Sequence, residues 1–252
     1  MIEIIILSLV QGITEFLPIS SSSHLILISE YLDYDNKSLS IDVSLHIGSF
    51  TAVIFYFWKD VINFFENKLL FLKILISSFP VLLVGFFLVE AEIIEKIRNL
   101  KIIAWTTTIF GIILFISDKF KLGKNIDDNF SFKSAMFIGF FQILSLIPGV
   151  SRSGIAITAA RLLQFKRVDA AKISFLLSIP ILGAVSIFGI KNLIFSENVY
   201  FTKLNLISIF LSFLFSLITI KYFLSYIKNF SLNIFVYYRV LLGIFLLALV
   251  YL

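Results

Sequence analysis

The chain of 252 residues contains no cysteine, only four prolines and few charged residues. Without cysteine, disulfide frameworks, thiolate metal sites and cysteine nucleophiles are excluded. Charged residues make up 15% of the chain, whereas 59% of the residues are hydrophobic and 30 are phenylalanine. Soluble domains contain about 25% charged and roughly 45 to 50% apolar residues. The composition therefore excludes an ordinary soluble domain and indicates a protein that lies in a lipid bilayer.

Hydrophobic stretches of membrane-spanning length recur along the chain. At about 1.5 Å of rise per residue, a helix needs about 20 apolar residues to cross roughly 30 Å of hydrocarbon. The stretches that reach or nearly reach this length are residues 43–58, 69–89, 101–117, 173–190, 205–224 and 234–252. No long polar linker separates them. The sequence therefore predicts an all-α polytopic membrane protein with six transmembrane helices in a single domain, residues 1–252.

Two further apolar regions, residues 2–29 and 134–165, are each broken in the middle by proline and hydroxyl residues. The first break is Pro18-Ile-Ser-Ser-Ser-Ser23, and the second is Pro148-Gly-Val-Ser-Arg-Ser-Gly154. Backbone that is released from helical hydrogen bonding cannot face lipid, so such breaks persist only inside protein or beside an aqueous cavity. Each region is therefore either a kinked span or a re-entrant pair of helices.

The distribution of lysine and arginine separates these alternatives for the second region. If both regions enter and leave on one side, thirteen basic residues lie on one side of the membrane, six lie on the other, and Arg152 and Arg239 lie within it. If residues 134–165 crossed the membrane, the two sides would carry ten and nine. Cytoplasmic loops are enriched in basic residues. We therefore expect two re-entrant helical pairs, with loops 31–42, 90–100 and 191–204 and the C-terminus facing outward.

The two broken regions share a sequence pattern. Gln11 precedes Ser20 by nine positions, and Gln142 precedes Ser151 by nine. Because the two regions enter from opposite sides, the pattern predicts an inverted repeat. Its two halves cover approximately residues 1–117 and 134–224, and the helix 234–252 follows them.

Each break places polar residues just before a helix. Ser20 to Ser23 precede a helix that opens near His24, and Ser151 to Gly154 precede a helix from Ile155 to Phe165. Free N–H groups and the positive end of the dipole make a helix N-terminus an anion site. Two such termini facing each other across a cavity suit a diphosphate, and Arg152 offers the planar donor that phosphate favours.

Ionisable groups within the membrane are candidates for function because each costs at least roughly 2.5 kcal/mol to insert. Glu15 lies one helical turn after Gln11, so the two side chains share a face. Beside a polyanion, such a carboxylate holds a divalent cation or transfers a proton. His24 lies within reach of Ser20 and Ser21, as in a serine nucleophile that is activated by a histidine base.

Structural interpretations remain open for several of these residues. Serine clusters often only satisfy the backbone that proline frees, which is our interpretation of Ser22 and Ser23. His46 is either an interhelical hydrogen-bonding group or, from its place in the first repeat, part of the binding site. Arg239 can pair within the helical bundle.

The segments Gln11-Gly-Ile-Thr-Glu15-Phe-Leu-Pro18-Ile-Ser20-Ser-Ser-Ser-His24 and Pro148-Gly-Val-Ser-Arg-Ser-Gly154 resemble the two signatures of the integral-membrane undecaprenyl diphosphatases. The resemblance covers essentially the whole chain. It implies the hydrolysis of undecaprenyl diphosphate to undecaprenyl phosphate, which recycles the lipid carrier for bacterial cell-wall synthesis, together with bacitracin resistance. It also implies a divalent metal ion, Mg²⁺ or Ca²⁺, and an active site in the bacterial cytoplasmic membrane that opens outward.

Together, motif and resemblance predict a set of site residues. We expect the catalytic residues to be Glu15, Ser21, His24 and Arg152. We expect the substrate-binding residues to be Gln11, Ser20, His46, Ser151, Ser153 and Gly154, and the metal ligands to be Gln11 and Glu15. Either Ser21, assisted by His24, attacks the terminal phosphorus, or a metal-bound water attacks with His24 as base or leaving-group acid.

Two other classes of function remain as alternatives. A transporter for the lipid carrier is favoured by broken helices in an inverted repeat. A non-catalytic lipid-binding scaffold leaves the cost of burying Glu15 and Arg152 unexplained. No glycine-rich nucleotide loop or nucleic-acid footprint is present, so we expect a polyprenyl diphosphate and membrane lipids as partners and no nucleic acid. The oligomeric state is open and includes a homodimer.

Overall fold

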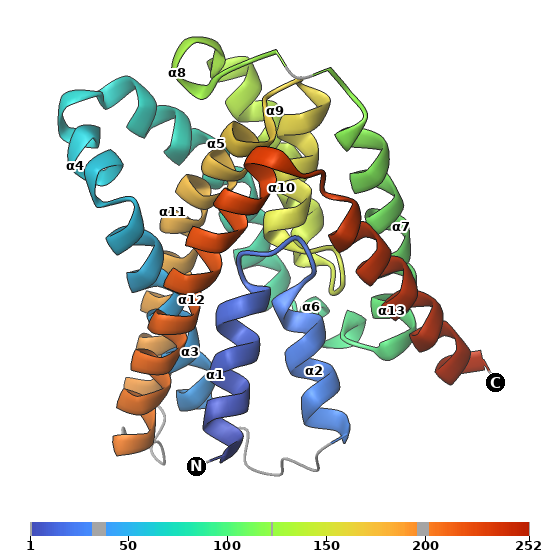
Figure 1. The fold of residues 1–252 in the computed structure, drawn as a ribbon. Helices are drawn as coiled ribbons and strands as arrows, with labels where there is room; N and C mark the ends of the chain where they lie inside the picture. The colour runs from blue at the N-terminus through green and yellow to red at the C-terminus, as the bar shows by residue number, and fades with distance from the viewer. Residues whose placement is uncertain (1, 32–38, 122, 196–201, 252) are drawn as a thin grey trace.

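The computed structural model of this chain describes residues 2–31, 39–121, 123–195 and 202–251 (Figure 1). Every named element in these ranges is a helix, so the prediction of an all-α protein is confirmed. The elements are α1 (Ile2–Thr14), α2 (Ser21–Tyr31), α3 (Leu39–Tyr56), α4 (Trp58–Glu66), α5 (Lys68–Glu90), α6 (Ile93–Ile97), α7 (Leu100–Asp118), α8 (Ile126–Asn129), α9 (Phe132–Ile143), η1 (Leu144–Leu146), α10 (Arg152–Leu162), α11 (Arg167–Phe195), α12 (Lys203–Asn229) and α13 (Asn233–Tyr251). Residues 32–38 and 196–201, which belong to loops expected to face outward, lie outside the described residues.

The predicted spans correspond to six of these helices. Within the described ranges, α5, α7, α11, α12 and α13 are each long and apolar enough to cross a membrane. The predicted span 43–58 corresponds to α3, which meets this criterion only together with α4, and the two helices are bent by 77° at Phe57. The chain is thus a multi-pass membrane protein, with five spans or with six if α3 and α4 count as one.

Both broken regions form helical pairs that turn back on themselves. In Figure 1, α1 and α2 rise from one end of the bundle and return to it, whereas α9 and α10 enter from the other end. The turns of the two pairs meet near the middle of the molecule. The re-entrant interpretation of residues 134–165 is therefore confirmed, and a kinked span is excluded. The limits of the two repeats, residues 1–117 and 134–224, stay a prediction.

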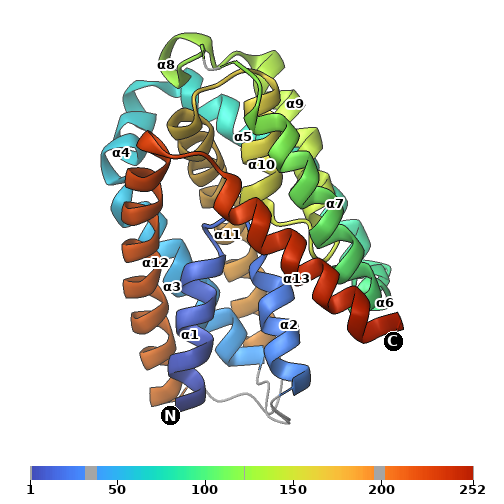
Figure 2. The same cartoon turned by 45° about the vertical axis from the view of Figure 1, so that its right-hand side comes forward.

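Small residues allow the spanning helices to approach closely around these pairs. α3 packs against α12, and α7 packs against α13 (Figure 2). A Cβ atom on Gly48 would lie 2.4 Å from the carbonyl oxygen of Ile209, so the backbones of α3 and α12 are in direct contact. The Ser212 hydroxyl donates to the Leu45 carbonyl at 2.7 Å across the same interface. Such close contacts stabilise helix pairs where lipid removes the hydrophobic drive for association.

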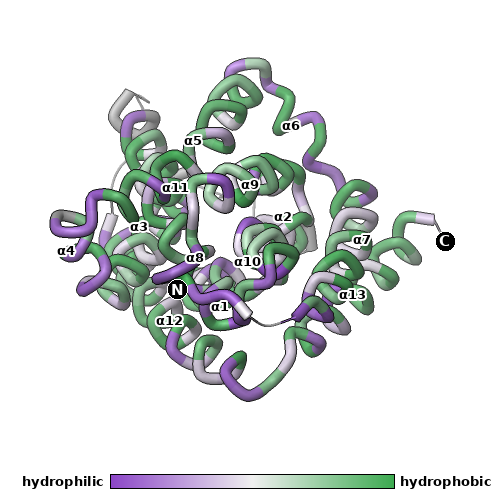
Figure 3. The backbone as a smooth tube through the Cα atoms, turned by 90° about the horizontal axis from the view of Figure 1, so that it is seen from above, coloured by the Kyte–Doolittle hydropathy of each residue, from purple (hydrophilic) through white to green (hydrophobic). Residues whose placement is uncertain are grey.

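The outer surface is apolar, as a lipid environment requires. Large exposed side chains include Phe79, Phe87, Ile187 and Leu241. Viewed from above, the outer helices are coloured mainly as hydrophobic, and hydrophilic residues gather at α4 and in the connecting segments (Figure 3). The polar groups of the broken pairs are therefore enclosed by a hydrophobic shell.

A buried ion cluster holds together the end of the bundle that carries α8. Asp118, at the end of α7, lies 3.4 Å from Nε of Arg161 and 2.8 Å from Nε of Arg167. Its second carboxylate oxygen accepts the backbone N–H of Leu232 at 3.1 Å. These contacts join α7, α10, α11 and the segment between α12 and α13, so the end of α10 is anchored on three sides.

Candidate active site

The two breaks share an unusual backbone conformation. Ser20 has a φ of 77° and Ser151 a φ of 70°, both in the left-handed region that non-glycine residues rarely occupy. Each serine immediately precedes a helix, α2 after Ser20 and α10 after Ser151. Conformations of this kind concentrate at functional sites, where the surrounding structure holds them. The equal spacing of Gln11–Ser20 and Gln142–Ser151 thus corresponds to similar, positive φ angles at the two serines.

Both helices begin earlier than the sequence predicts. α2 begins at Ser21 rather than near His24, and α10 begins at Arg152 rather than at Ile155. For α10 a serine hydroxyl explains the earlier start, because Oγ of Ser151 accepts the N–H of Gly154 at 3.1 Å and so satisfies the first turn. Ser21 and Arg152 therefore belong to the first turns of their helices, beside N–H groups that have no partner within the helix.

A cavity of about 70 Å³ lies where the two breaks meet. Its lining consists of polar residues: Thr14, Glu15, Ser20, Ser21, Ser22, Ser145, Ser151 and Arg152. The N-termini of α2 and α10 both border this space, as the sequence predicted. An anion in the cavity would face two positive helix ends and one guanidinium group.

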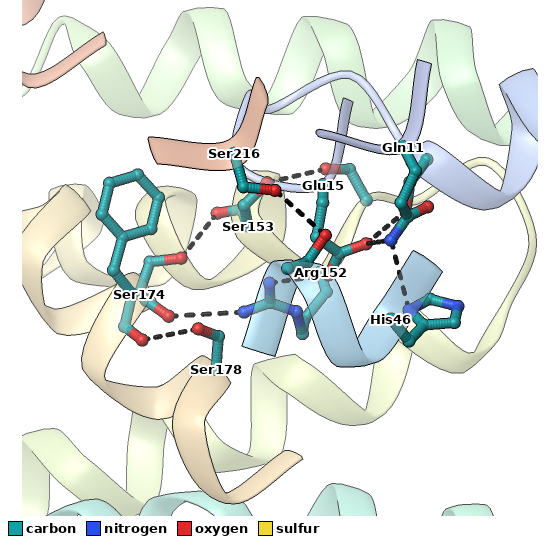
Figure 4. A network of polar contacts seen from close by, with 12 residues as sticks. Gln11, Glu15, His46, Arg152, Ser153, Ser174, Ser178 and Ser216 are labelled. Carbon is teal, nitrogen blue, oxygen red and sulfur yellow. Dashed lines mark hydrogen bonds and ion pairs between the residues drawn. The ribbon is translucent and has the colours of Figure 1, made fainter. Parts of the chain in front are cut away.

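Glu15 and Arg152 form an ion pair at the edge of the cavity (Figure 4). Nη2 of Arg152 lies 2.9 Å from Oε1 of Glu15, and both side chains are nearly buried. The other oxygen, Oε2, accepts the hydroxyl of Ser21 at 2.7 Å. Nη1 of Arg152 donates to the carbonyl of Ser174 on α11 at 3.4 Å. Glu15 thus contacts both a nucleophile candidate and the phosphate-binding candidate.

Gln11 holds Glu15 from the side away from Arg152. Its Nε2 donates to Oε2 of Glu15 at 3.1 Å and lies 3.2 Å from Nδ1 of His46. Because an amide NH₂ group only donates, Nδ1 of His46 is the acceptor. His46 therefore joins α3 to the site through Gln11, as Figure 4 shows, and it does not border the cavity.

Two buried polar atoms of the site have no hydrogen-bond partner: Oε1 of Gln11 and Nε of Arg152. Unpaired polar atoms are costly in a buried site, so a bound ligand is the natural partner for them. The Arg152 atom is a donor suited to a phosphate oxygen, and the Gln11 atom is an acceptor suited to a cation.

The donor set fits a divalent cation only in the company of a substrate. Among the described residues, no group of three or more His, Cys, Asp or Glu side chains could hold a metal ion. Mg²⁺ is commonly bound by one or two carboxylates together with substrate phosphates. Glu15 and the free Oε1 of Gln11 match that incomplete set.

His24 does not contact Ser21, contrary to the expected pairing of base and nucleophile. Its Nδ1 lies 2.7 Å from the carbonyl oxygen of Ser20, and its Nε2 lies 2.5 Å from the hydroxyl of Tyr238 on α13. The hydroxyl of Ser21 donates to Glu15 instead. The ring donates to the backbone carbonyl of Ser20, four residues earlier. Sequence spacing alone could not distinguish this carbonyl from the hydroxyl groups of Ser20 and Ser21.

Ser153 and Gly154 lie behind the cavity and connect the two breaks. The hydroxyl of Ser153 donates to the carbonyl of Leu17 in the first break at 2.8 Å. A Cβ atom on Gly154 would lie 3.0 Å from Nη1 of Arg239, so only glycine leaves room for that guanidinium without displacement. Their observed contacts stabilise the junction, and substrate binding by these two residues stays a prediction.

Arg239 is fully buried and bonds to both breaks. It donates to the carbonyls of Pro18 at 3.2 Å, Gly149 at 2.9 Å and Thr107 at 3.2 Å. The breaks leave carbonyl groups without helical hydrogen bonds, and Arg239 supplies a charged donor for them. Inside a bilayer such groups must be hydrogen-bonded within the protein, because no water is available. The expectation that Arg239 pairs within the bundle is confirmed, with backbone acceptors as its partners.

Several site residues were missed by the sequence analysis. Thr14 and Ser145 border the cavity, and Ser22, which was interpreted as structural, also does so. Ser145 lies three residues after Gln142 and just before the second break, so its position in the sequence could have indicated that it borders the site. Tyr238 stands in an apolar span far along the chain from His24, and only the fold reveals their contact.

Comparison with known proteins gives matches over nearly the full length. The chain matches the family described as "Bacitracin resistance protein BacA" over residues 4–245. It is 51% identical over 251 residues to an undecaprenyl-diphosphatase of Pelagibacter ubique, covering 99% of this chain and 98% of that protein. Undecaprenyl-diphosphatases of Saccharophagus degradans and Jannaschia sp. are 42% and 39% identical over 260 residues, covering 98% of this chain and 97% of each relative.

Proposed function

The chain belongs to the bacitracin resistance protein BacA family, and on that basis we propose that it hydrolyses undecaprenyl diphosphate to undecaprenyl phosphate and inorganic phosphate. The observation that carries the proposal is the polar cavity bordered by two helix N-termini and the Glu15–Arg152 pair. Two helix N-termini and a guanidinium group beside one cavity favour a phosphorylated anion as the ligand. Overproduction of the protein would confer bacitracin resistance by consuming the diphosphate that the antibiotic sequesters.

The diphosphate is held by charge and by oriented donors. The first turns of α2 and α10 offer N–H groups, and the unpartnered Nε of Arg152 offers a further donor. When the phosphate enters, it competes with Glu15 for the guanidinium of Arg152. The carboxylate of Glu15 is thereby freed from its ion pair at the moment when a base is needed. Such neutralisation and positioning supply most of the catalysis in phosphoryl transfer.

Ser21 is the nucleophile in this mechanism, and Glu15 is its base. The Ser21 hydroxyl already donates to Oε2 of Glu15 at 2.7 Å. Its oxygen bonds to the terminal phosphorus, its proton passes to Glu15, and the bond from that phosphorus to the bridging oxygen breaks. Undecaprenyl phosphate leaves with the bridging oxygen, and water then hydrolyses the phosphoserine. Direct attack by water, with Ser21 and Glu15 orienting it, is the competing route.

Gln11 and Glu15 are the residues that would hold a divalent ion, Mg²⁺ or Ca²⁺. When bound, such an ion supplies charge neutralisation and polarisation to the phosphoryl group. The free Oε1 of Gln11 supports this assignment. His46 keeps the Gln11 amide oriented by accepting its second hydrogen.

The protein resides, in this proposal, in the bacterial cytoplasmic membrane with its cavity opening outward. The thirteen basic residues counted for the cytoplasmic side belong to segments at the end of the bundle that carries α4 and α8. The α1–α2 pair enters from the opposite end, so its serines are approached from outside. The lipid tail of the substrate remains among the apolar helices.

Phosphate release from undecaprenyl diphosphate, measured with purified protein in detergent with Mg²⁺ or Ca²⁺, tests the proposal. We expect release by the wild type and collapse of release in Glu15→Ala and Arg152→Ala. The matched controls are Glu90→Ala and Arg98→Ala, which remove the same charges from exposed positions. They are expected to retain wild-type rates.

The alternative outcomes are informative. A folded wild type that releases no phosphate with either metal would refute the phosphatase and lead to lipid-transport assays in liposomes. Equal losses in the site variants and in the exposed controls would show that the cavity is not the site.

A further inference from the structure

His24 and Tyr238 form a paired arrangement that the proposed mechanism does not use. The two rings, from α2 and α13, are stacked with centroids 5.7 Å apart and planes 13° apart. The hydroxyl of Tyr238 lies 2.5 Å from Nε2 of His24. The contact joins residues separated by 214 positions. Both ring nitrogens of His24 are therefore engaged, one by Tyr238 and one by Ser20.

The two partners together determine the tautomer of His24. The carbonyl oxygen of Ser20, 2.7 Å from Nδ1, can only accept a hydrogen bond. Nδ1 must therefore carry the proton, and in the neutral ring Nε2 is left as an acceptor. The Tyr238 hydroxyl is then the donor to Nε2. The hydrogen bond at one nitrogen of an imidazole fixes which form the other presents.

The pair lies beside the first break and is linked to it twice. Ser20 has a positive φ and borders the cavity, so its carbonyl joins the His24 ring to the cavity wall. Arg239, next to Tyr238, donates to the carbonyl of Pro18 in the same break. Two successive residues of α13 thus hold the start of α2. Tyr238 as a residue is 42% exposed.

We infer that Tyr238 is a positioning residue for the reaction: its hydroxyl donates to Nε2 of His24 and orients the ring, whose Nδ1–H form the Ser20 carbonyl sets, so that the Nε2 lone pair is directed toward α13 and away from Ser21. The inference rests on the proposed function and adds His24 to its mechanism. In this inference, Nε2, on the side of Tyr238, is the nitrogen at which His24 gains or loses a proton. His24 therefore does not deprotonate Ser21, whose hydroxyl donates to Glu15.

Tyr238→Phe is the test variant because it keeps the stacked ring and removes only the hydroxyl. Tyr237→Phe is the matched control, since Tyr237 is the adjacent tyrosine and is 59% exposed. In the phosphate-release assay we expect Tyr238→Phe to lower kcat by about tenfold, as for the loss of one oriented hydrogen bond, with KM changed less than about twofold. Tyr237→Phe is expected to match the wild type.

Nitrogen-15 NMR of imidazole-labelled protein gives a second readout that does not depend on activity. The chain contains only two histidines, so the His24 resonances can be assigned with a single His46→Gln variant. At a pH at which imidazole is neutral, we expect a protonated Nδ1 and a hydrogen-bonded, unprotonated Nε2 in the wild type. In Tyr238→Phe, the Nε2 resonance should move to the position of a free imine nitrogen.

The outcomes separate this inference from the proposed function. A wild type with the proton on Nε2, or an unchanged Nε2 resonance in Tyr238→Phe, would overturn the inference whatever the activity. A phosphatase-active wild type whose kcat is unaffected by Tyr238→Phe would also overturn it. A wild type without phosphatase activity but with the expected resonances would refute the proposed function while leaving the His24 geometry established.

Discussion

Nη2 of Arg152 lies 2.9 Å from Oε1 of Glu15, although 137 positions separate the two residues. Each stands at one of the two breaks, so the ion pair forms only when the re-entrant pairs meet. The pair also compensates two charges that would each be expensive in a membrane interior. In the proposed mechanism, binding of the anionic substrate begins by exchanging one partner of Arg152 for another.

Arg152→Lys is expected to lower kcat/KM by at least about 100-fold. Lysine keeps the charge but loses the planar fork that lets one side chain contact Glu15, Ser174 and a phosphate together. Phosphate release by the purified variant measures the effect. Arg98→Lys is the control at an exposed site, and equal rates for Arg152→Lys and the wild type would contradict the role of the fork.

Ser21→Ala is expected to lower the rate of phosphate release by at least about 1,000-fold, because it removes the proposed nucleophile together with its hydrogen bond to Glu15. Rapid acid quenching of the wild type with labelled substrate should trap a phosphoserine at position 21. Thr51→Ala, which removes an exposed hydroxyl bonded within α3, serves as control. A variant Ser21→Ala that keeps most of the wild-type kcat would favour direct attack by water.

Chelation of divalent cations is expected to stop the reaction, and Gln11→Leu to raise the metal concentration for half-maximal activity by about tenfold. The free Oε1 of Gln11 is the atom lost in this variant. Titration of phosphate release with Mg²⁺ and with Ca²⁺ measures the shift. Gln164→Leu at an exposed position is the control. An unchanged metal requirement in Gln11→Leu would remove Gln11 from the ligand set.

Arg239→Met is expected to lower the free energy of unfolding by about 3 kcal/mol or more. The substitution leaves the carbonyls of Pro18, Gly149 and Thr107 without their charged donor in a buried site. Thermal unfolding in detergent, compared with Arg98→Met, gives the difference. A Tm equal to that of the control would show that the three carbonyls find other donors.

Gly48→Ala is expected to destabilise the α3–α12 interface by about 1 to 3 kcal/mol. The new Cβ atom would lie 2.4 Å from the carbonyl oxygen of Ile209, and a backbone neighbour can yield only if the helices separate. Gly123→Ala is the control, because a Cβ atom there meets no other atom within 4 Å. Unfolding midpoints of the two variants should differ clearly; coincident midpoints would mean that the interface adapts.

Sequence spacing predicted the parts of the site that depend on local pattern. The equal spacings from Gln11 to Ser20 and from Gln142 to Ser151 correspond to positive φ angles at both serines. The basic residues indicated correctly that the α9–α10 pair turns back. These features could be predicted because each depends on the residues of a single segment or on the basic residues that flank it.

The remaining features depend on contacts between distant segments. His24 and Ser21 share the first turn of α2, but the ring bonds to a carbonyl and to a tyrosine of α13, which no local spacing encodes. The helix start at Arg152 depends on a hydroxyl cap, from Ser151 to the N–H of Gly154, that forms only once the backbone has turned at Ser151.

The hydrogen bonds from α13 to both breaks have a consequence for the biogenesis of the enzyme. Arg239 and Tyr238 follow Ser21 and Arg152 in the chain, so the ribosome delivers them after every other group of the site. A nascent chain whose synthesis has stopped before Asn233 holds both serine clusters but lacks the donors that fix them. The contacts of α13 therefore predict that catalytic competence is acquired late in biogenesis, when this helix enters the bilayer and docks.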